Sequence, residues 1–106
     1  MTFDEIWNAI RQLCPSAEFK QGDHLGETYV SLPGIRYPGA GAMCEISLQA
    51  ARNHQDAAVK IWSRLMELNA LEPLYRDLGP AKSLSGRRYE LVHWDGTHWV
   101  NVGFDE

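Results

Sequence analysis

Residues 88–104 read RYELVHWDGTHWVNVGF, and this stretch decides the fold class of the chain. Two runs of β-branched and aromatic residues flank Asp95-Gly96, a dipeptide that favours a two-residue type I′ turn. The pattern predicts a C-terminal β-hairpin in which residues 88–94 pair antiparallel with residues 97–104. In that register the opposed pairs are Trp94 with Thr97, His93 with His98, Val92 with Trp99, Leu91 with Val100, and Tyr89 with Val102.

Both faces of this hairpin carry apolar side chains, which predicts that it lies inside a sheet and is covered on one side by helices. Trp94 and Trp99 share the face opposite the histidines, with Val92 alongside. This tryptophan face fits three roles equally well: a second core, a self-association surface or a contact site for another protein.

The N-terminal segment predicts a helix, because Thr2 and Glu5 have the spacing of a capping box. Apolar residues then recur every three or four positions, and Pro15 ends the pattern. The apolar stripe comprises Phe3, Ile6, Trp7, Ile10 and Leu13.

Residues 16–49 change to a period of two and predict short strands at 17–20, 27–32 and 42–49. Residues 33–41 hold two of the five prolines and three of the nine glycines, which predicts an irregular surface loop. We expect that loop to be structural or to form a contact, and we add its Arg36 and Tyr37 to the candidate partner-binding residues Val92, Trp94 and Trp99.

Residues 43–51 also fit a helical period, so strand and helix both remain open for them. We prefer a strand followed by a helix, because Asn53 and Asp56 have the spacing of a helix N-terminus. The principal helix covers residues 57–68 and buries Ala57, Ala58, Ile61, Trp62, Leu65 and Leu68. Pro73 is placed to open a short helix over residues 74–78, and residues 81–86 read as a connection.

Composition excludes several classes of protein. One domain over residues 1–106 is expected from the length, and 44% apolar residues argue against disorder. A net charge of −4 disfavours a nucleic-acid partner, and no apolar run is long enough to span a bilayer. With two cysteines and no basic-then-apolar leader, we expect a cytoplasmic protein with unpaired thiols.

Chemical motifs are weak throughout the chain. If His93 and His98 are opposed they could share a metal ion, but no third ligand has a recognised spacing. Cys14 and Cys44 lie in no family-specific sequence and read as small hydrophobes. Gly39-Ala40-Gly41 does not open into a helix, as a phosphate-binding loop would, and Arg87-Arg88 is too short to be a nucleic-acid tract. We therefore assign no catalytic residue, no metal ligand and no cofactor.

The sequence predicts a two-layer α+β fold: an N-terminal helix, a mostly antiparallel sheet of four or five strands, a central helix and a C-terminal β-hairpin. The function that fits best is a small protein-interaction module without catalytic activity, such as an inhibitor, an immunity-type protein or an adaptor. Its partner would be another protein or a second copy of the chain. The alternatives are a small-molecule- or metal-binding protein with a pocket near His93 and His98, and a structural homo-oligomer that covers the tryptophan face by symmetry.

Overall fold

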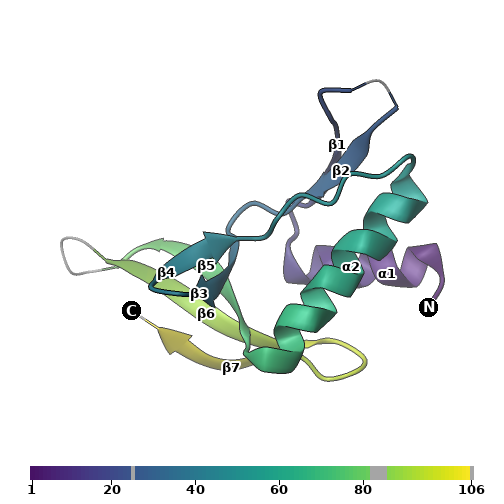
Figure 1. The fold of residues 1–106 in the computed structure, drawn as a ribbon. Coiled ribbons are helices and arrows are strands. Elements are labelled where there is room, and N and C mark those ends of the chain that lie inside the picture. Colours follow the sequence, from purple (N-terminus) through teal and green to yellow (C-terminus); the bar gives the residue numbers. More distant parts are fainter. Residues whose placement is uncertain (25, 82–85, 106) are drawn as a thin grey trace.

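The structure is a computed structural model that describes residues 1–24, 26–81 and 86–105 (Figure 1). Its elements in chain order are α1 (Phe3–Leu13), β1 (Glu18–Gln21), β2 (Thr28–Ser31), β3 (Ile35–Gly39), β4 (Ala42–Glu45), α2 (His54–Leu71), β5 (Leu74–Pro80), β6 (Arg87–Trp94) and β7 (Trp99–Asp105). Five strands form an antiparallel sheet in the order β4-β3-β5-β6-β7, and β1 pairs with β2 in a separate antiparallel pair. The predicted α+β fold is confirmed.

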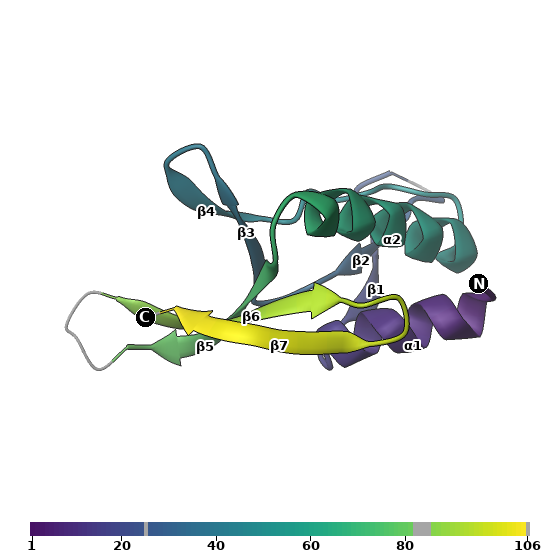
Figure 2. The same cartoon turned by 90° about the horizontal axis from the view of Figure 1, so that it is seen from below.

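One side of the five-stranded sheet faces α2. Figure 2 shows α2 above β6 and the turn end of β7, with α1 beside the turn that joins β6 to β7. The core fills the space between the helices and this side of the sheet. Its most deeply buried large side chains are Ile10, Leu13, Ile35, Ile61, Leu65, Leu74 and Val92.

Both helix starts follow the sequence prediction. The Thr2 hydroxyl accepts the Glu5 N–H at 3.2 Å and the Glu5 carboxylate accepts the Thr2 N–H at 3.1 Å, which completes the capping box of α1. The Asn53 side chain accepts the Asp56 N–H at 2.8 Å and caps α2. All six residues predicted to be buried on α2 are buried.

The segment between 33 and 41 is not an irregular loop, because it contains β3. That strand pairs with β4 along its length and with β5 at Ile35 and Arg36. Pro38 is tolerated because β3 has no β5 partner beyond Arg36, so its missing N–H breaks no bond on that side. Pairing with β4 and β5 outweighed the local turn signal.

Residues 42–49 form a strand only over Ala42–Glu45, followed by extended chain up to the α2 cap, so the strand interpretation of residues 43–51 is confirmed in part. A strand over residues 42–49 would bury every second side chain, but the side chains at the two ends of this segment are not buried. Ala42 is exposed, and Leu48 is 63% exposed.

The predicted helix over 74–78 is wrong, because these residues belong to β5. Leu74 opposes Val92 in the core, and six residues of β5 pair with β6. A five-residue helix gains little by itself, whereas the ladder with β6 satisfies backbone groups along the whole segment. Within the predicted connection 81–86, residues 82–85 lie outside the described residues.

The hairpin exists, but its register differs from the prediction by two residues on β7 from Val92 to Trp94, and by three beyond the bulge, where Leu91 opposes Gly103. Trp94 opposes Trp99, His93 opposes Val100 and Val92 opposes Asn101. The tip is Gly96-Thr97, because the Asp95 carboxylate accepts the N–H groups of Thr97 and His98 at 2.8 and 2.9 Å. Aspartate readily accepts such bonds, and a type I′ turn would instead require a positive φ at Asp95, which it does not have.

Gly96→Val should lower the free energy of unfolding by more than about 1 kcal/mol, because Gly96 has φ +106° and a β-branched residue resists that conformation. Gly96→Asn should cost much less, since asparagine tolerates positive φ better. The measurement is chemical denaturation of the wild type and both variants. Equal midpoints for the wild type and Gly96→Val would contradict this account of the turn.

Candidate functional site

The tryptophan face of the hairpin turns toward the helices. The indole of Trp62 on α2 meets Trp94 edge-on at 4.9 Å and Trp99 at 6.0 Å between ring centroids. Trp99 is 6% exposed, Val92 is 2% exposed, and Trp94 is half-buried. Val92 and Trp99 thus form part of the core, which corrects the expectation that they present surface to a partner. Trp94 alone of the three keeps accessible surface.

Two side-chain amides hold this hairpin end in place. Asn69 of α2 accepts the Trp94 N–H at 3.0 Å and donates to the Trp94 carbonyl at 3.5 Å. Gln12 of α1 makes the same pair of bonds with Trp99, at 3.1 and 3.3 Å. Each side-chain amide thus bonds the N–H and C=O groups of one residue that a neighbouring strand would otherwise bond. Sequence reasoning missed both residues, because a polar side chain on a helix does not reveal a partner 25 or 87 positions away.

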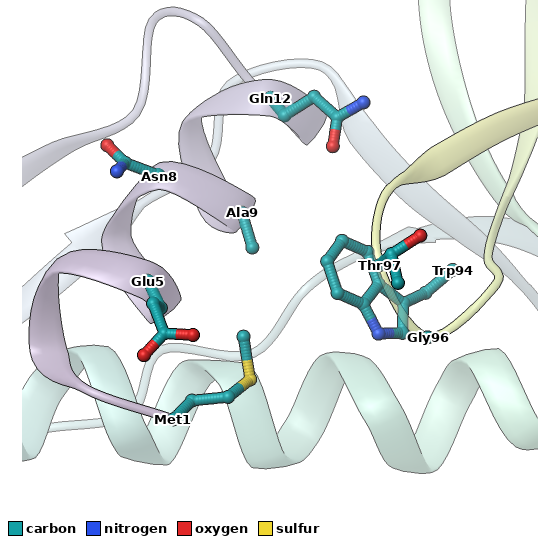
Figure 3. A pocket seen from close by; sticks show the side chains of 8 residues that line it. All are labelled: Met1, Glu5, Asn8, Ala9, Gln12, Trp94, Gly96 and Thr97. Atoms are coloured by element: carbon teal, nitrogen blue, oxygen red, sulfur yellow. The ribbon is translucent and has the colours of Figure 1, made fainter.

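A cavity of about 450 Å³ separates α1 from the β6–β7 turn, and Trp94 forms one wall of it (Figure 3). Its other lining residues are Met1, Glu5, Asn8, Ala9, Gln12, Gly96 and Thr97. In Figure 3 the side chains of Glu5, Ala9 and Met1 project into the space that faces the Trp94 ring. Hydrogen bonds from Thr2 lower the pKa of Glu5, so the cavity has an ionised carboxylate at its rim. We call this space the Trp94 cavity.

A second concavity of about 280 Å³ lies between β3 and the C-terminal half of α2. Its lining residues, which define the Tyr37 groove, are Tyr37, Pro38, Arg64, Leu68, Leu71, Glu72 and Pro73. The guanidinium carbon of Arg64 lies 5.8 Å from the centroid of the Tyr37 ring, at cation–π distance. Leu71 is 81% exposed at its edge. The lining of the groove is therefore largely apolar and includes two charged side chains, Arg64 and Glu72.

Arg36 lies on the other side of the sheet from Tyr37, because neighbouring strand residues point to opposite faces. Its guanidinium pairs with Glu45 at 3.2 Å and lies 4.0 Å from Asp77. Asp77 also accepts a bond of 2.8 Å from Arg87, and this bond lowers the pKa of Asp77. The five predicted partner-binding residues thus occupy the core, the Trp94 cavity, the Tyr37 groove and the far side of the sheet, and they do not form one surface.

The predicted His93–His98 pair does not form, because the observed register puts Val100 opposite His93. His98 lies in the turn, with its Nδ1 atom 2.9 Å from the Thr97 hydroxyl and 3.5 Å from the Asp95 carboxylate. Over residues 1–24, 26–81 and 86–105, no three histidine, cysteine or acidic side chains gather where they could hold a metal ion. His54 stacks on Phe19 with 3.9 Å between ring centroids.

The two cysteines do not form a disulfide. Cys14 is buried, and its thiol donates to the Pro33 carbonyl at 3.5 Å, as expected of a small core residue. Cys44 is half-buried on β4 and donates to the Ala42 carbonyl.

Comparison of the chain with protein-family models, with curated protein sequences and with solved structures gave no match. In the part of the chain that the structure describes, neither helix has the length and apolarity to cross a membrane.

Proposed function

We propose that this chain is a small protein-interaction module of the cytosol, without catalytic activity, that binds a segment of another protein in the Tyr37 groove. An inhibitor, an immunity-type protein and an adaptor would all use such a surface. The observation that carries the proposal is the 81% exposure of Leu71 beside an apolar groove with a tyrosine and an arginine in its wall. The free thiols of Cys14 and Cys44 suit a reducing compartment.

The chemistry of the groove favours an apolar anchor residue on the partner. Tyr37, Leu68 and Leu71 supply apolar area, and a space of about 280 Å³ admits one or two large side chains. Tyrosine and arginine are the residue types that dominate binding energy at protein interfaces, because they combine a broad apolar surface with a polar end. Arg64 and Glu72 also line the groove and would orient polar groups of the partner near the anchor.

Leu71→Asp should weaken capture of a partner from a lysate of the native host by tenfold or more, because the new carboxylate would have to be desolvated against the anchor. The matched control is Val59→Asp, which places the same charge at a residue of α2 that is 48% exposed and outside the groove. The measurement is quantitative mass spectrometry of proteins retained by each immobilised variant, after a thermal melt has shown that both fold.

A partner retained equally by the wild type and Leu71→Asp would contradict the Tyr37 groove as the binding site. Tyr37→Ala provides an independent check, because it removes the ring that Arg64 covers and adds no charge. We expect the two groove variants to lose the same protein and Val59→Asp to keep it.

The Trp94 cavity favours a second candidate function, binding of a small molecule. Its volume of about 450 Å³ is in the usual range for ligand sites, and an indole wall opposite several polar groups is a common lining. Native mass spectrometry of protein purified from its own host tests this function. A retained small ligand that is lost in Trp94→Leu supports it, and a ligand-free spectrum contradicts it.

A further inference from the structure

The side of the sheet that faces away from α2 carries a continuous band of aromatic and aliphatic residues. Tyr89, Leu91 and His93 point to this side from β6, Tyr75 from β5 and Val100 from β7, as the pairing and the strand alternation require. Tyr75 and Tyr89 meet edge-on with 5.7 Å between ring centroids. We call this surface the open face.

No helix covers the open face in the part of the chain that the structure describes. Figure 2 shows α2 on the other side of the sheet and α1 beside the turn that joins β6 to β7. All five residues of the band are half-buried by their neighbours in the sheet and keep accessible surface. A sheet with an apolar second face gains free energy when another layer covers that face.

The order of the outward residues along β6 indicates which molecule could form the layer that covers the open face. The outward positions read Arg87, Tyr89, Leu91, His93 and, in the same alternation at the start of the turn, Asp95. The row is basic at one end, acidic at the other and apolar in the middle. When the row of a second copy is reversed and laid over the first, a cation lies above a carboxylate at each end. Between the ends, an aromatic ring lies above an aromatic ring, and at the centre leucine lies above leucine.

The charged side chains at the two ends keep accessible surface. Arg87 donates to Asp77 at 2.8 Å, and its side chain is 50% exposed whereas that of Asp77 is 9% exposed, so the guanidinium is the group that meets the solvent at this end. The Asp95 side chain is 37% exposed, and bonds from Thr97 and His98 keep its pKa at about 2, so the other end is negative at neutral pH.

We propose that the open face binds a second copy of this chain, with β6 of the two copies antiparallel across a two-fold axis at Leu91. Arg87 of one copy then faces Asp95 of the other, and Tyr89 faces His93. A second copy fits better than an unrelated protein because the row complements its own reverse. The Tyr37 groove opens on the opposite side of the sheet, so this contact is independent of the function proposed above.

The contact area sets the expected affinity. Eight residues separate Arg87 from Asp95, a span of about 27 Å along an extended strand, and the band is three strands wide at about 4.8 Å spacing. This footprint is smaller than the roughly 800 Å² per partner of a standard stable interface. We therefore expect a dissociation constant in the micromolar range or weaker.

Sedimentation equilibrium over a concentration series of the full chain tests the dimer. We expect reversible dimerisation of the wild type, and we expect Leu91→Asp to raise the dissociation constant at least tenfold, because the axis would bring two carboxylates together. Leu48→Asp, at a residue 63% exposed in the segment between β4 and α2, is the control and should not change it. Arg87→Glu is a second variant at a more exposed site and should weaken the dimer by repulsion from Asp95.

Cross-linking then tests the register, with Cys44→Ser as the background and Cys14 left buried. With a short bismaleimide, Leu91→Cys should link to itself, and Tyr89→Cys should link to His93→Cys when the two are mixed. A monomer at every concentration, or a dimer that Leu91→Asp leaves intact, would overturn the proposal. Self-linking of Tyr89→Cys without mixed linking would overturn the antiparallel arrangement.

Discussion

Replacing Trp99 by threonine should lower the free energy of unfolding by about 3 to 5 kcal/mol, by analogy with the truncation of other buried tryptophans. Trp99 is 6% exposed, and its indole N–H donates to the Ala9 carbonyl at 2.9 Å. The ring also contacts Trp62 and Trp94, so its loss opens a cavity where α1, α2 and the hairpin meet.

The control for this substitution is Val102→Thr, on the same strand at a residue that is 51% exposed. It should change stability by less than about 0.5 kcal/mol, the usual range for a surface substitution. Urea denaturation of both variants gives the comparison. A similar small effect for Trp99→Thr would show that the indole is not part of the core, and sedimentation analysis of the same proteins would then reveal whether it serves association.

Arg76→Met should lower the free energy of unfolding by about 2 to 3 kcal/mol, because this one side chain joins α1 to the sheet. Its guanidinium donates to the carbonyls of Leu13 and Gln12 at 2.9 and 3.2 Å and pairs with Glu90 on β6. These carbonyls belong to the last turn of α1, where helix carbonyls lack partners within the helix. The side chains of Arg76 and Glu90 are 27% and 21% exposed, so water replaces the lost bonds only in part.

The effect of Arg76→Met should shrink at low pH. Bonds from Asn101 and Arg76 lower the pKa of Glu90 in the folded protein, so its carboxylate stabilises the fold at pH values above the pKa of glutamate in the unfolded chain. That contribution is lost as the pH falls through the lower folded pKa. Denaturation at pH 7 and pH 3 measures the change. Arg64→Met, which breaks an exposed pair with Glu67, is the control and should cost less than about 1 kcal/mol at either pH.

The two proposed binding surfaces lie on opposite sides of the sheet, so each should be affected only by substitutions on its own side. The Tyr37 groove lies on the helix side of the sheet and the open face on the other, so a partner and a second copy could bind at the same time. Leu71→Asp should therefore leave dimerisation unchanged, and Leu91→Asp should leave partner capture by the groove intact.

The sequence by itself determined the features that depend on near neighbours in the chain. Three features follow from residues a few positions apart in the chain. They are the helix caps at Thr2 and Asn53, the buried stripe of α2, and the positive φ of Gly96 in the hairpin turn. Their patterns are local because a capping bond or a helix face involves positions three or four apart. The hairpin was visible for the same reason, since its two strands adjoin in sequence.

The tertiary structure alone decided which strands pair, in what register, and what the exposed surfaces are. Residues 35–39 and 74–80 become strands because each forms a ladder with other strands, residues 35–39 with β4 and β5 and residues 74–80 mainly with β6, against turn and helix signals in their own sequence. The hairpin register depends on bonds to Asp95 and on the amides of Gln12 and Asn69, which no local pattern reveals. The Tyr37 groove forms only when β3 packs beside α2. The open face exists because α2 lies on the other side of the sheet and α1 lies beside the β6–β7 turn. Burial is a property of the whole fold, and this explains why the sequence left a core role and a contact role open for Trp94 and Trp99, of which Trp99 lies in the core and Trp94 in a cavity wall.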